Sequence, residues 1–339
     1  MLRLRLAIVG SLRFPGGTST AIADELPVLE SLGDVVFYDA DVKMLRQCPK
    51  NDALVRSLRL HQVPVAPASG IVAADVVIVH NPALFKYEDS LDLRLVGRRV
   101  FVVMHENPVT AFCSPTYQCE RVLGMLRAAS VTPGFFLAPI SRVSRQSIAN
   151  AGLSFPVTQT DWRNVWSGEF RAPVQRPLDR RGRHSRPGPE KWPKPDDLDL
   201  CFPRHAVNHI LGAPPWLTEA TNTAPSTFHY PFGSMDVGGF LERVDFFVYF
   251  HSEGWRESFG RCIAEAIAAG KLVITHPYLE QTFGKGCVYA TPAEVDRIIA
   301  FYLDRPAEYV AKVGRAQRDL ARNNGPARVA EDLRAMVLA

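Results

Sequence analysis

Two carboxylates, Glu257 and Glu265, are separated by seven residues in the C-terminal half of the chain. Gly260 can open a helix and Gly270 can end it, so Glu257 is expected at the helix N-terminus and Glu265 about two turns inside. With a rise of about 1.5 Å per residue, the carboxylates lie roughly 12 Å apart along the axis. This span suits a nucleotide sugar, whose hexose and ribose hydroxyls would each meet a carboxylate while the diphosphate meets the positive helix end.

Strand-like runs flank this motif, with 245–250 before it and 271–275 after it. The segment is therefore predicted to form a strand, a loop, a helix and a second strand. We expect the residues at the helix start, Ser258, Phe259 and Gly260, to contact the same ligand. The spacing alone occurs often by chance, and a solvated pair on one helix is the alternative.

A basic loop precedes the apolar part of the C-terminal half. Arg186 and Lys191 stand five positions apart there, and Arg183 is a competitor for the role of Arg186. Arginine offers a planar bidentate fork and lysine a mobile point charge, a combination that suits a diphosphate leaving group. A solvated basic loop is the alternative.

Further candidates follow strand-like runs in the N-terminal half. Gly16 and Gly17 come between the first strand and the first helix, where backbone N–H groups can closely approach a phosphate or a sugar hydroxyl, so we expect them to bind the donor. His105 ends the run at 100–104, and His80 with Asn81 ends the run at 76–79. We predict that His105 is catalytic and that His80 and Asn81 contact an acceptor, although single histidines are more often structural.

The composition is that of a soluble globular protein: 339 residues, 47% hydrophobic, 22% charged and a net charge of +4. The longest apolar runs are too short to span a membrane, and the N-terminus lacks the apolar core of a signal peptide, so a cytoplasmic protein is expected. The six cysteines show no C-x-x-C spacing, which favours free thiols. The absence of an Asp-x-Asp motif argues against a metal site.

The positive charge is concentrated in one segment. Residues 161–195 contain nine basic and four acidic residues, an excess of +5 that leaves the rest of the chain about neutral. A nucleic-acid binder more often spreads its charge over a face with interleaved aromatics. We therefore expect a small polyanionic ligand and no nucleic acid.

Alternating strand and helix signals predict an α/β fold with parallel sheets covered on both faces. Domain boundaries are predicted as follows: 1–160 for an N-terminal Rossmann-like domain, 161–180 for a linker, 181–322 for a C-terminal Rossmann-like domain and 323–339 for a final helix. A helix is expected within 45–60 and an apolar run of the second domain at 198–202. The elements between 205 and 240 could not be assigned.

The run Glu257-Ser-Phe-Gly, followed by Glu265-Ala-Ile-Ala-Ala-Gly270, resembles the E-x7-E signature of retaining GT-B glycosyltransferases of the family 4 type. The resemblance implies two Rossmann-like domains facing across a cleft, with the C-terminal helix crossing back onto the first. It also implies transfer of a hexose from a nucleoside diphosphate sugar, with UDP favoured, to a hydroxyl with retention of configuration.

Roles for individual residues follow from the same resemblance. Arg186 and Lys191 would stabilise the departing diphosphate, Glu257 and His105 would hold the sugar, and Glu265 would hold the ribose. No cofactor or metal is implied. The acceptor would be a glycan, a lipid-linked molecule or a small molecule in cell-surface polysaccharide or glycolipid synthesis, and the basic linker would allow peripheral contact with the inner membrane face.

Three alternatives remain open from the sequence. An inverting transferase would need a general base in the N-terminal half, for which His105, His80 and Glu106 are candidates. A nucleotide-sugar epimerase would share the fold. A catalytically silent scaffold would bind the nucleotide sugar without turnover. A dinucleotide-dependent oxidoreductase fits less well, because Gly10, Gly16 and Gly17 do not have the Gly-x-Gly-x-x-Gly spacing.

Overall fold

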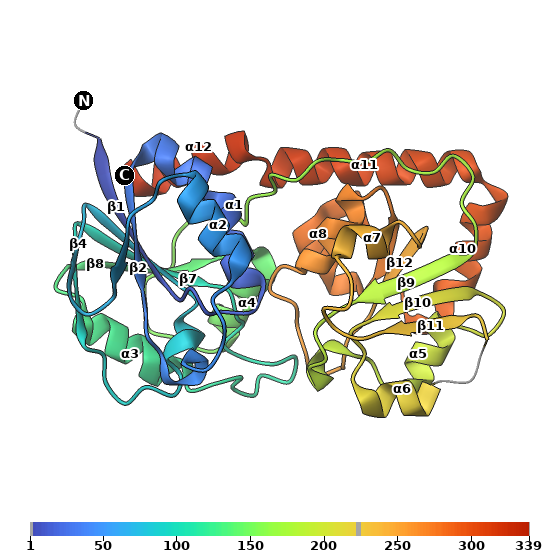
Figure 1. Ribbon diagram of the computed structural model, residues 1–339, viewed down its shortest axis with the longest axis horizontal. Helices are drawn as coiled ribbons and strands as arrows, with labels where there is room; N and C mark the ends of the chain where they lie inside the picture. The colour runs from blue at the N-terminus through green and yellow to red at the C-terminus, as the bar shows by residue number, and fades with distance from the viewer. Residues whose placement is uncertain (1–2, 222–224, 339) are drawn as a thin grey trace. The chain divides into compact units, whose positions relative to one another are not determined.

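The computed structural model describes residues 3–221 and 225–338. The chain forms two compact units, Met1–Ser167 with Asn324–Ala339, and Gly168–Asn323. Each unit is built on a six-stranded sheet in which every paired strand is parallel (Figure 1). The predicted α/β class is confirmed.

The sheet of the first unit has the strand order β3-β2-β1-β5-β7-β8. A separate pair, β4 with β6, lies outside it. Strands β5 and β7 are buried along almost their whole length, which explains their uninterrupted Val, Ile and Phe content. The strands are β1 (Leu4–Gly10), β2 (Gly33–Asp39), β3 (Val65–Pro67), β4 (Gly70–Ala73), β5 (Val76–His80), β6 (Leu93–Val96), β7 (Arg99–Met104) and β8 (Gly134–Pro139).

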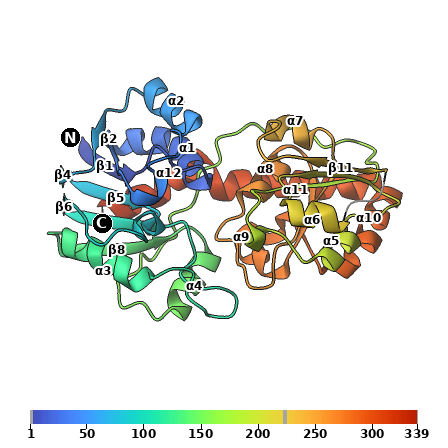
Figure 2. The same ribbon diagram turned by 60° about the horizontal axis from the view of Figure 1, so that its bottom comes forward.

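Helices cover both faces of this sheet. Both views place α1, α2 and α12 on one face and α3 and α4 on the other (Figure 2). The final helix packs beside α1, so the predicted return of the C-terminal helix to the N-terminal domain is confirmed. The helices are α1 (Gly17–Leu32), α2 (Asp52–Leu60), α3 (Cys119–Ala129), α4 (Arg142–Asn150) and α12 (Pro326–Leu338).

The sheet of the second unit has the order β11-β10-β9-β12-β13-β14. Alternate residues of β12 enter a core cluster with side chains of α5, α10 and α11. The strands are β9 (Arg180–His184), β10 (Val207–Leu211), β11 (Thr227–Tyr230), β12 (Phe246–Tyr249), β13 (Leu272–Thr275) and β14 (Val288–Tyr289). The helices are α5 (Pro195–Cys201), α6 (Pro215–Thr221), α7 (Val237–Leu241), α8 (Arg261–Ala268), α9 (Glu280–Phe283), α10 (Val295–Asp304) and α11 (Pro306–Asn324).

Both sheets share one topological property. In the first unit the strand order reverses between β1 and β5, and in the second it reverses between β9 and β12. Loops that leave adjacent strands in opposite directions open a crevice at the carboxyl ends of those strands, which is where doubly wound sheets bind ligands. Each unit therefore has one preferred position for a site.

Three sequence-based expectations need correction or completion. The helix expected within 45–60 begins only at Asp52, after a single 3-10 turn at Lys43–Leu45. The apolar run at 198–202 belongs to helix α5 rather than to a strand. The strand before the basic loop is β9, with the sequence Arg-Arg-Gly-Arg-His, which the hydrophobic pattern did not reveal.

The region 205–240, unassigned from the sequence, contains β10, α6, β11 and α7, apart from residues 222–224, which lie outside the described residues. Across the described part of the chain, every helix is too short or too polar to cross a membrane.

Candidate functional site

The predicted strand, loop, helix and strand around Glu257 is confirmed as β12, a loop, α8 and β13. Gly260 is the N-cap of α8 with φ of 86°, a left-handed conformation that L side chains rarely adopt. Gly270 also has a positive φ, of 76°, and lies just beyond the end of α8. The two glycines fix where α8 begins and ends, and so where Glu257 and Glu265 project.

Glu257 lies in the loop at the carboxyl end of β12, beside the switch point of the second sheet. Its Oε1 accepts hydrogen bonds from Lys191 Nζ at 2.7 Å and from the Tyr249 hydroxyl at 2.6 Å. Its backbone N–H donates to the Tyr278 oxygen at 2.8 Å. The fold thus brings together Glu257 and Lys191, two predicted site residues that are 66 positions apart.

The charge state of Glu257 is set by these neighbours. Burial alone would raise the pKa of the carboxyl, but the Lys191 ammonium and the hydrogen bonds from Lys191 and Tyr249 outweigh burial and lower the pKa to about 2. Glu257 is therefore an ionised acceptor at neutral pH. Its position is fixed further because Tyr278, which accepts from its backbone, also lies 2.6 Å from His251 Nε2.

Lys191 is held by the second predicted arginine, Arg183. The Arg183 side chain is fully buried at the end of β9 and donates to the carbonyl oxygens of Phe250 at 2.5 Å and Lys191 at 2.6 Å. Its guanidinium lies 4.0 Å from the centroid of the Trp192 ring. Arg183 was predicted to bind the donor, but here it is committed to backbone groups and fixes the loop that carries Lys191.

Arg186, the alternative to Arg183, has a different environment. Its side chain is half exposed and forms an ion pair with Glu190 four residues later in the same loop. Its carbonyl oxygen accepts from Trp192 Nε1 at 2.9 Å, which ties the loop to the buried indole. Between the two arginines, Arg186 is the one whose guanidinium can leave a surface partner to meet an anion.

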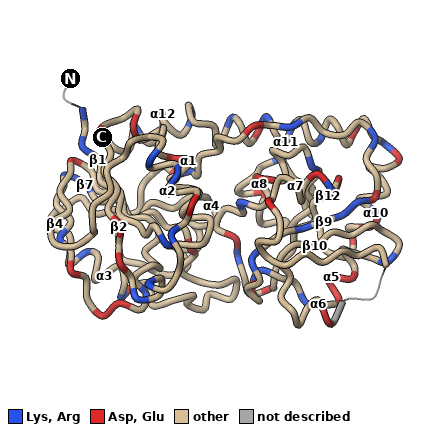
Figure 3. Tube along the Cα trace, in the orientation of Figure 1, with Lys and Arg blue, Asp and Glu red and all other residues tan. Residues whose placement is uncertain are grey.

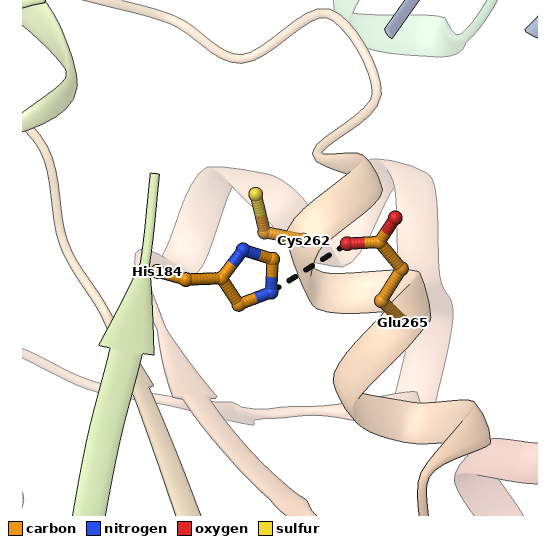
Figure 4. A group of neighbouring side chains, drawn as sticks. All are labelled: His184, Cys262 and Glu265. Atoms are coloured by element: carbon orange, nitrogen blue, oxygen red, sulfur yellow. Dashed lines mark ion pairs between the residues drawn. The ribbon is translucent and has the colours of Figure 1, made fainter. Parts of the chain in front are cut away.

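Glu265 lies on α8 and converges with His184 and Cys262 (Figure 4). One of its oxygens accepts from Arg261 Nε at 3.1 Å, and the other lies 3.5 Å from His184 Nε2. Burial lowers the pKa of His184 to about 3, so this imidazole is neutral at physiological pH. Glu265 is only partly buried, which leaves its carboxylate accessible to a ligand.

The same three side chains are the kind of set that could hold a metal ion, because their donor atoms lie within 4.8 Å of one another. Histidine, thiolate and carboxylate are ligands of Zn²⁺. The electrostatics oppose a cation, however: burial and the nearby Arg183 guanidinium both disfavour added positive charge at His184, as its lowered pKa shows, and burial raises the pKa of the Cys262 thiol well above its usual value, which disfavours the thiolate. The geometry favours Glu265 as an acceptor for ligand hydroxyls.

Basic residues lie along β9 (Figure 3), and ion pairs neutralise much of the local basic excess there. Arg180 makes a bidentate pair with buried Asp245, at 2.9 Å for each contact. Arg181 pairs with Asp179 at 2.7 Å and with Asp296 at 2.6 Å. The expectation that this segment serves a polyanion is therefore too broad. The predicted ligand cations outside β9 are Arg186 and Lys191, and each of them has a carboxylate partner of its own.

In the first unit, the residues predicted at the switch point also gather there. Gly16 caps α1 in an extended conformation, and α1 begins at Gly17. A Cβ added at Gly17 would meet nothing within 4 Å, so the fold itself does not require glycine at this position. Asn81, with φ of 57°, donates from Nδ2 to Thr18 Oγ1 at 3.2 Å and so links the end of β5 to the start of α1.

The two predicted histidines are in direct contact. His80 Nδ1 lies 3.0 Å from His105 Nε2, and their ring centroids are 5.2 Å apart. His80 is fully buried and His105 partly exposed. Burial lowers the pKa of His105 to about 3 and that of His80 well below its usual value, so both rings are neutral.

Several residues of these two clusters were not anticipated from the sequence. In the second unit they are Tyr249, His251 and Tyr278, whose hydroxyl and ring nitrogens surround Glu257. In the first unit they are Glu25 and Trp162, which lie behind His80. The one available signal was a glutamate in the apolar stripe of α1, because a charged residue at such a position is rarely buried without a reason.

Comparison with models of known protein families gave no match, and comparison of the sequence with curated proteins also gave none. Comparison of the fold with solved structures did give matches. Anabaena HepE (Alr3699), solved in complex with UDP-glucose, has a TM-score of 0.67 at 13% identity, with 99% of each chain covered.

An α-glucosyltransferase, solved in complex with UDP and a DNA containing an HMU base, has a TM-score of 0.60 at 10% identity, covering 99% of this chain and 100% of its own. TarM from S. aureus has a TM-score of 0.55 at 13% identity, covering 78% of this chain and 55% of its own. These likenesses, together with the two parallel sheets, show that the chain has the GT-B fold, as the sequence predicted.

Proposed function

We propose that this protein is a glycosyltransferase that moves a hexose from a nucleoside diphosphate sugar, with UDP as the favoured base, to an acceptor hydroxyl with retention of configuration. The observation that carries the proposal is the ion pair between the partly buried Lys191 Nζ and the buried Glu257 Oε1, 2.7 Å apart at the switch point of the second unit. Solved structures of the same fold were determined with UDP and UDP-glucose, which supports the choice of donor.

The leaving diphosphate would be stabilised by charge already in place. Lys191 is fixed through its backbone by Arg183, so its ammonium needs little reorganisation to meet a phosphate oxygen. The N-terminal end of α8, which begins at Arg261, would add backbone N–H groups and the positive end of the helix dipole, with Ser258, Phe259 and Gly260 in the loop just before it. Arg186 would exchange Glu190 for phosphate when the donor binds.

The two carboxylates would hold the ends of the donor. Glu257 is ionised and fixed from three sides, and it would accept hydrogen bonds from hexose hydroxyls. Glu265 lies further along α8 and would accept from the ribose hydroxyls. Neither carboxylate is assigned as a nucleophile.

The bonds that break and form would all lie within the donor and the acceptor. The bond from the anomeric carbon to the phosphate oxygen breaks, and a bond to the acceptor oxygen forms on the same face of the sugar. The departing phosphate takes the proton of the acceptor hydroxyl. The chain would supply positioning and electrostatic stabilisation.

The first unit would serve the acceptor half of the reaction. Its switch point carries Gly16, Gly17 and the partly exposed His105, which are neutral groups able to meet hydroxyls, whereas His80 and Asn81, predicted to contact an acceptor, are buried. We keep a glycan, a lipid-linked molecule and a small alcohol as acceptor classes, in the setting of cell-surface glycan synthesis.

The contact between His80 and His105 favours a second candidate, an inverting transferase in which His105 is a general base. Anomeric analysis of the product by NMR separates the two candidates. Retention from UDP-α-glucose gives an α-glycoside, and inversion gives a β-glycoside.

The experiment that tests the proposal measures UDP release from UDP-glucose with and without a panel of acceptors. We expect acceptor-dependent UDP release and glycoside formation in the native protein, and loss of both in Glu257→Gln. Tight UDP-glucose binding with no product from any acceptor would instead identify a scaffold.

A further inference from the structure

A buried chain of polar side chains runs through the first unit behind His105. Trp162 Nε1 donates to Glu25 Oε1 at 3.1 Å, and the same oxygen lies 3.9 Å from His80 Nε2. His80 Nδ1 then lies 3.0 Å from His105 Nε2. Glu25 is 2% exposed and His80 is fully buried, so this chain leads from the interior to the partly exposed His105.

The longest gap in this series of polar side chains lies between Glu25 and His80. His80 Nε2 is buried and has no hydrogen-bond partner among the described residues. A buried polar atom without a hydrogen bond destabilises the folded state. The carboxyl of Glu25 is less than about 1 Å beyond normal hydrogen-bonding distance, and a small side-chain rotation would close the gap.

The protons of Glu25, His80 and His105 can be distributed in two ways. If Glu25 is protonated, its O–H donates to His80 Nε2, so His80 Nδ1–H donates to His105 Nε2 and His105 carries its own proton on Nδ1. If Glu25 is ionised, His80 Nε2–H donates to Glu25, His80 Nδ1 accepts from His105 Nε2–H, and His105 Nδ1 becomes an acceptor. Each arrangement satisfies the facing ring nitrogens.

We propose that Glu25 is a positioning residue that sets, through His80, which ring nitrogen of His105 carries the proton. Loss of the Glu25 proton converts His105 Nδ1 from a hydrogen-bond donor into an acceptor without changing the net charge of either ring. Glu25 and His80 together switch the tautomer of His105 while its imidazole stays neutral.

The environment of Glu25 gives its carboxyl a pKa within a pH range that can be used in an experiment. Burial raises the pKa of Glu25 to about 8, against a smaller lowering effect of the Trp162 hydrogen bond. His105, with a pKa of about 3, does not itself titrate in that range. The pH of the medium can therefore move the Glu25 proton while both histidine rings stay neutral.

Three carboxylates on the elements around Glu25 have partners of their own. Asp161, next to Trp162, contacts Arg145 at 2.6 Å. On α12, which packs against α1, Asp332 lies 3.4 Å from Arg163. Asp24, the neighbour of Glu25, accepts from Ser167 Oγ at 3.1 Å. His80 and His105 remain as the titratable groups that the chain itself connects.

The consequence for chemistry rests on the proposed function. A hydroxyl substrate that donates its proton needs an acceptor nitrogen, and one held through its oxygen needs a donor. Glu25 would decide which of these His105 offers, although it touches no substrate. The tautomer itself is independent of any reaction, so it can be measured even if the proposed activity is wrong.

The test is a pH titration of the full-length protein by ¹⁵N NMR of histidine side chains, with the His105 signals assigned from a His105→Gln variant. We expect the protonated and unprotonated nitrogens of His105 to exchange identity with a midpoint near pH 8. In Glu25→Gln the exchange should be absent between pH 6.5 and 9.5. In Glu30→Gln, a matched change on α1 at a glutamate that contacts His61, the native titration should persist.

A second variant protects the test if Glu25→Gln does not fold. Trp162→Phe removes a donor to the Glu25 carboxylate, so the midpoint should move to higher pH. A native His105 that keeps one tautomer throughout would overturn the proposal. So would a titration that survives Glu25→Gln, or a midpoint that Trp162→Phe leaves unchanged.

Discussion

The two units have the same strand topology but opposite electrostatics at their switch points. In the second unit a lysine and a carboxylate form a buried ion pair, and the carboxylate is held ionised with a pKa of about 2. In the first unit a carboxyl and two histidines lie together without forming charges, because burial raises the pKa of Glu25 and lowers the pKa values of His80 and His105.

This difference teaches that the doubly wound topology fixes where a site forms but leaves its chemistry to the residues at the strand ends. A fixed charge pair is suited to a ligand that carries formal charge, such as a diphosphate. A neutral relay is suited to hydroxyls, which exchange hydrogen bonds without net charge transfer to the protein. The division agrees with the proposed roles of donor and acceptor.

The largest expected effect comes from Lys191, in the charged site of the second unit. Lys191→Met should lower kcat by about 10²–10³-fold, because it removes the preorganised positive charge for the leaving diphosphate. Steady-state kinetics with UDP-glucose measures this change. Lys194→Met, at an exposed lysine three residues away, is the matched control and should keep native kcat.

Lys191→Met should also destabilise the fold, because Glu257 would then be a buried carboxylate without its partner, at a cost of roughly 3 kcal/mol. The double variant Lys191→Met/Glu257→Gln should recover most of the stability in urea denaturation but none of the activity. A double variant as unstable as Lys191→Met would mean that the unpaired Glu257 carboxylate is not the cause of the destabilisation.

The second prediction concerns pH and stability. The folded-state pKa of His184, about 3, lies below its unfolded value of 6.5, so the unfolded chain binds a proton first as pH falls. This group therefore stabilises the native state above pH 6.5 and loses about 2 kcal/mol of that contribution between pH 8 and pH 5. His184→Gln should show a flatter dependence of the urea midpoint on pH by this amount. An unchanged slope would indicate that His184 becomes protonated in the native state.

A smaller effect on kcat is expected from His105, in the uncharged cluster of the first unit. His105→Gln should lower kcat by about tenfold, because a hydrogen bond that orients the reaction is lost while the charge balance is unaffected. His61→Gln, at a partly exposed histidine of the same unit, should have native kinetics. A loss as large as that of Lys191→Met would make His105 a general base and favour the inverting reaction.

The smallest effect separates the two arginines of the basic loop. Arg186→Gln removes a half-exposed ion pair, so stability should change by less than about 0.5 kcal/mol, while the Kd for UDP rises about threefold. Arg183→Met leaves two buried carbonyl oxygens without their donor and should cost about 3 kcal/mol. Urea denaturation and UDP titration of both variants measure the contrast, and equal stability of the two would contradict it.

The parts of the fold that could be predicted are those where local pattern and tertiary environment agree. The buried runs of β5 and β7 and the glycines that bound α8 carry their structure in a few adjacent residues. Strand β9 could not be found in this way. Three arginines occupy a central strand there because Asp245 and Asp296, which are distant in the sequence, neutralise Arg180 and Arg181, and because Arg183 donates to backbone carbonyl oxygens. No local pattern reveals such partners.

The candidate site divides in the same way. Glu257, His80 and His105 could be proposed because each follows a recognisable strand, and Lys191 could be proposed from its spacing to Arg186 in a basic loop. Tyr249, in the apolar strand β12, and Tyr278, in the turn after β13, could not be, because a tyrosine is indistinguishable from a packing residue until its hydroxyl partner is known. The choice between Arg183 and Arg186 likewise depended on burial, which their spacing does not encode.

The measurement that tests the central claim most directly is a calorimetric titration of UDP and of UDP-glucose into the native protein, Lys191→Met, Glu257→Gln and Glu265→Gln. The account predicts that Lys191→Met and Glu265→Gln weaken both ligands, because diphosphate and ribose are common to them. Glu257→Gln should weaken UDP-glucose while leaving UDP binding unchanged, because only the hexose meets that carboxylate. Native protein that binds neither ligand, or a Glu257→Gln variant that weakens both equally, would contradict the account.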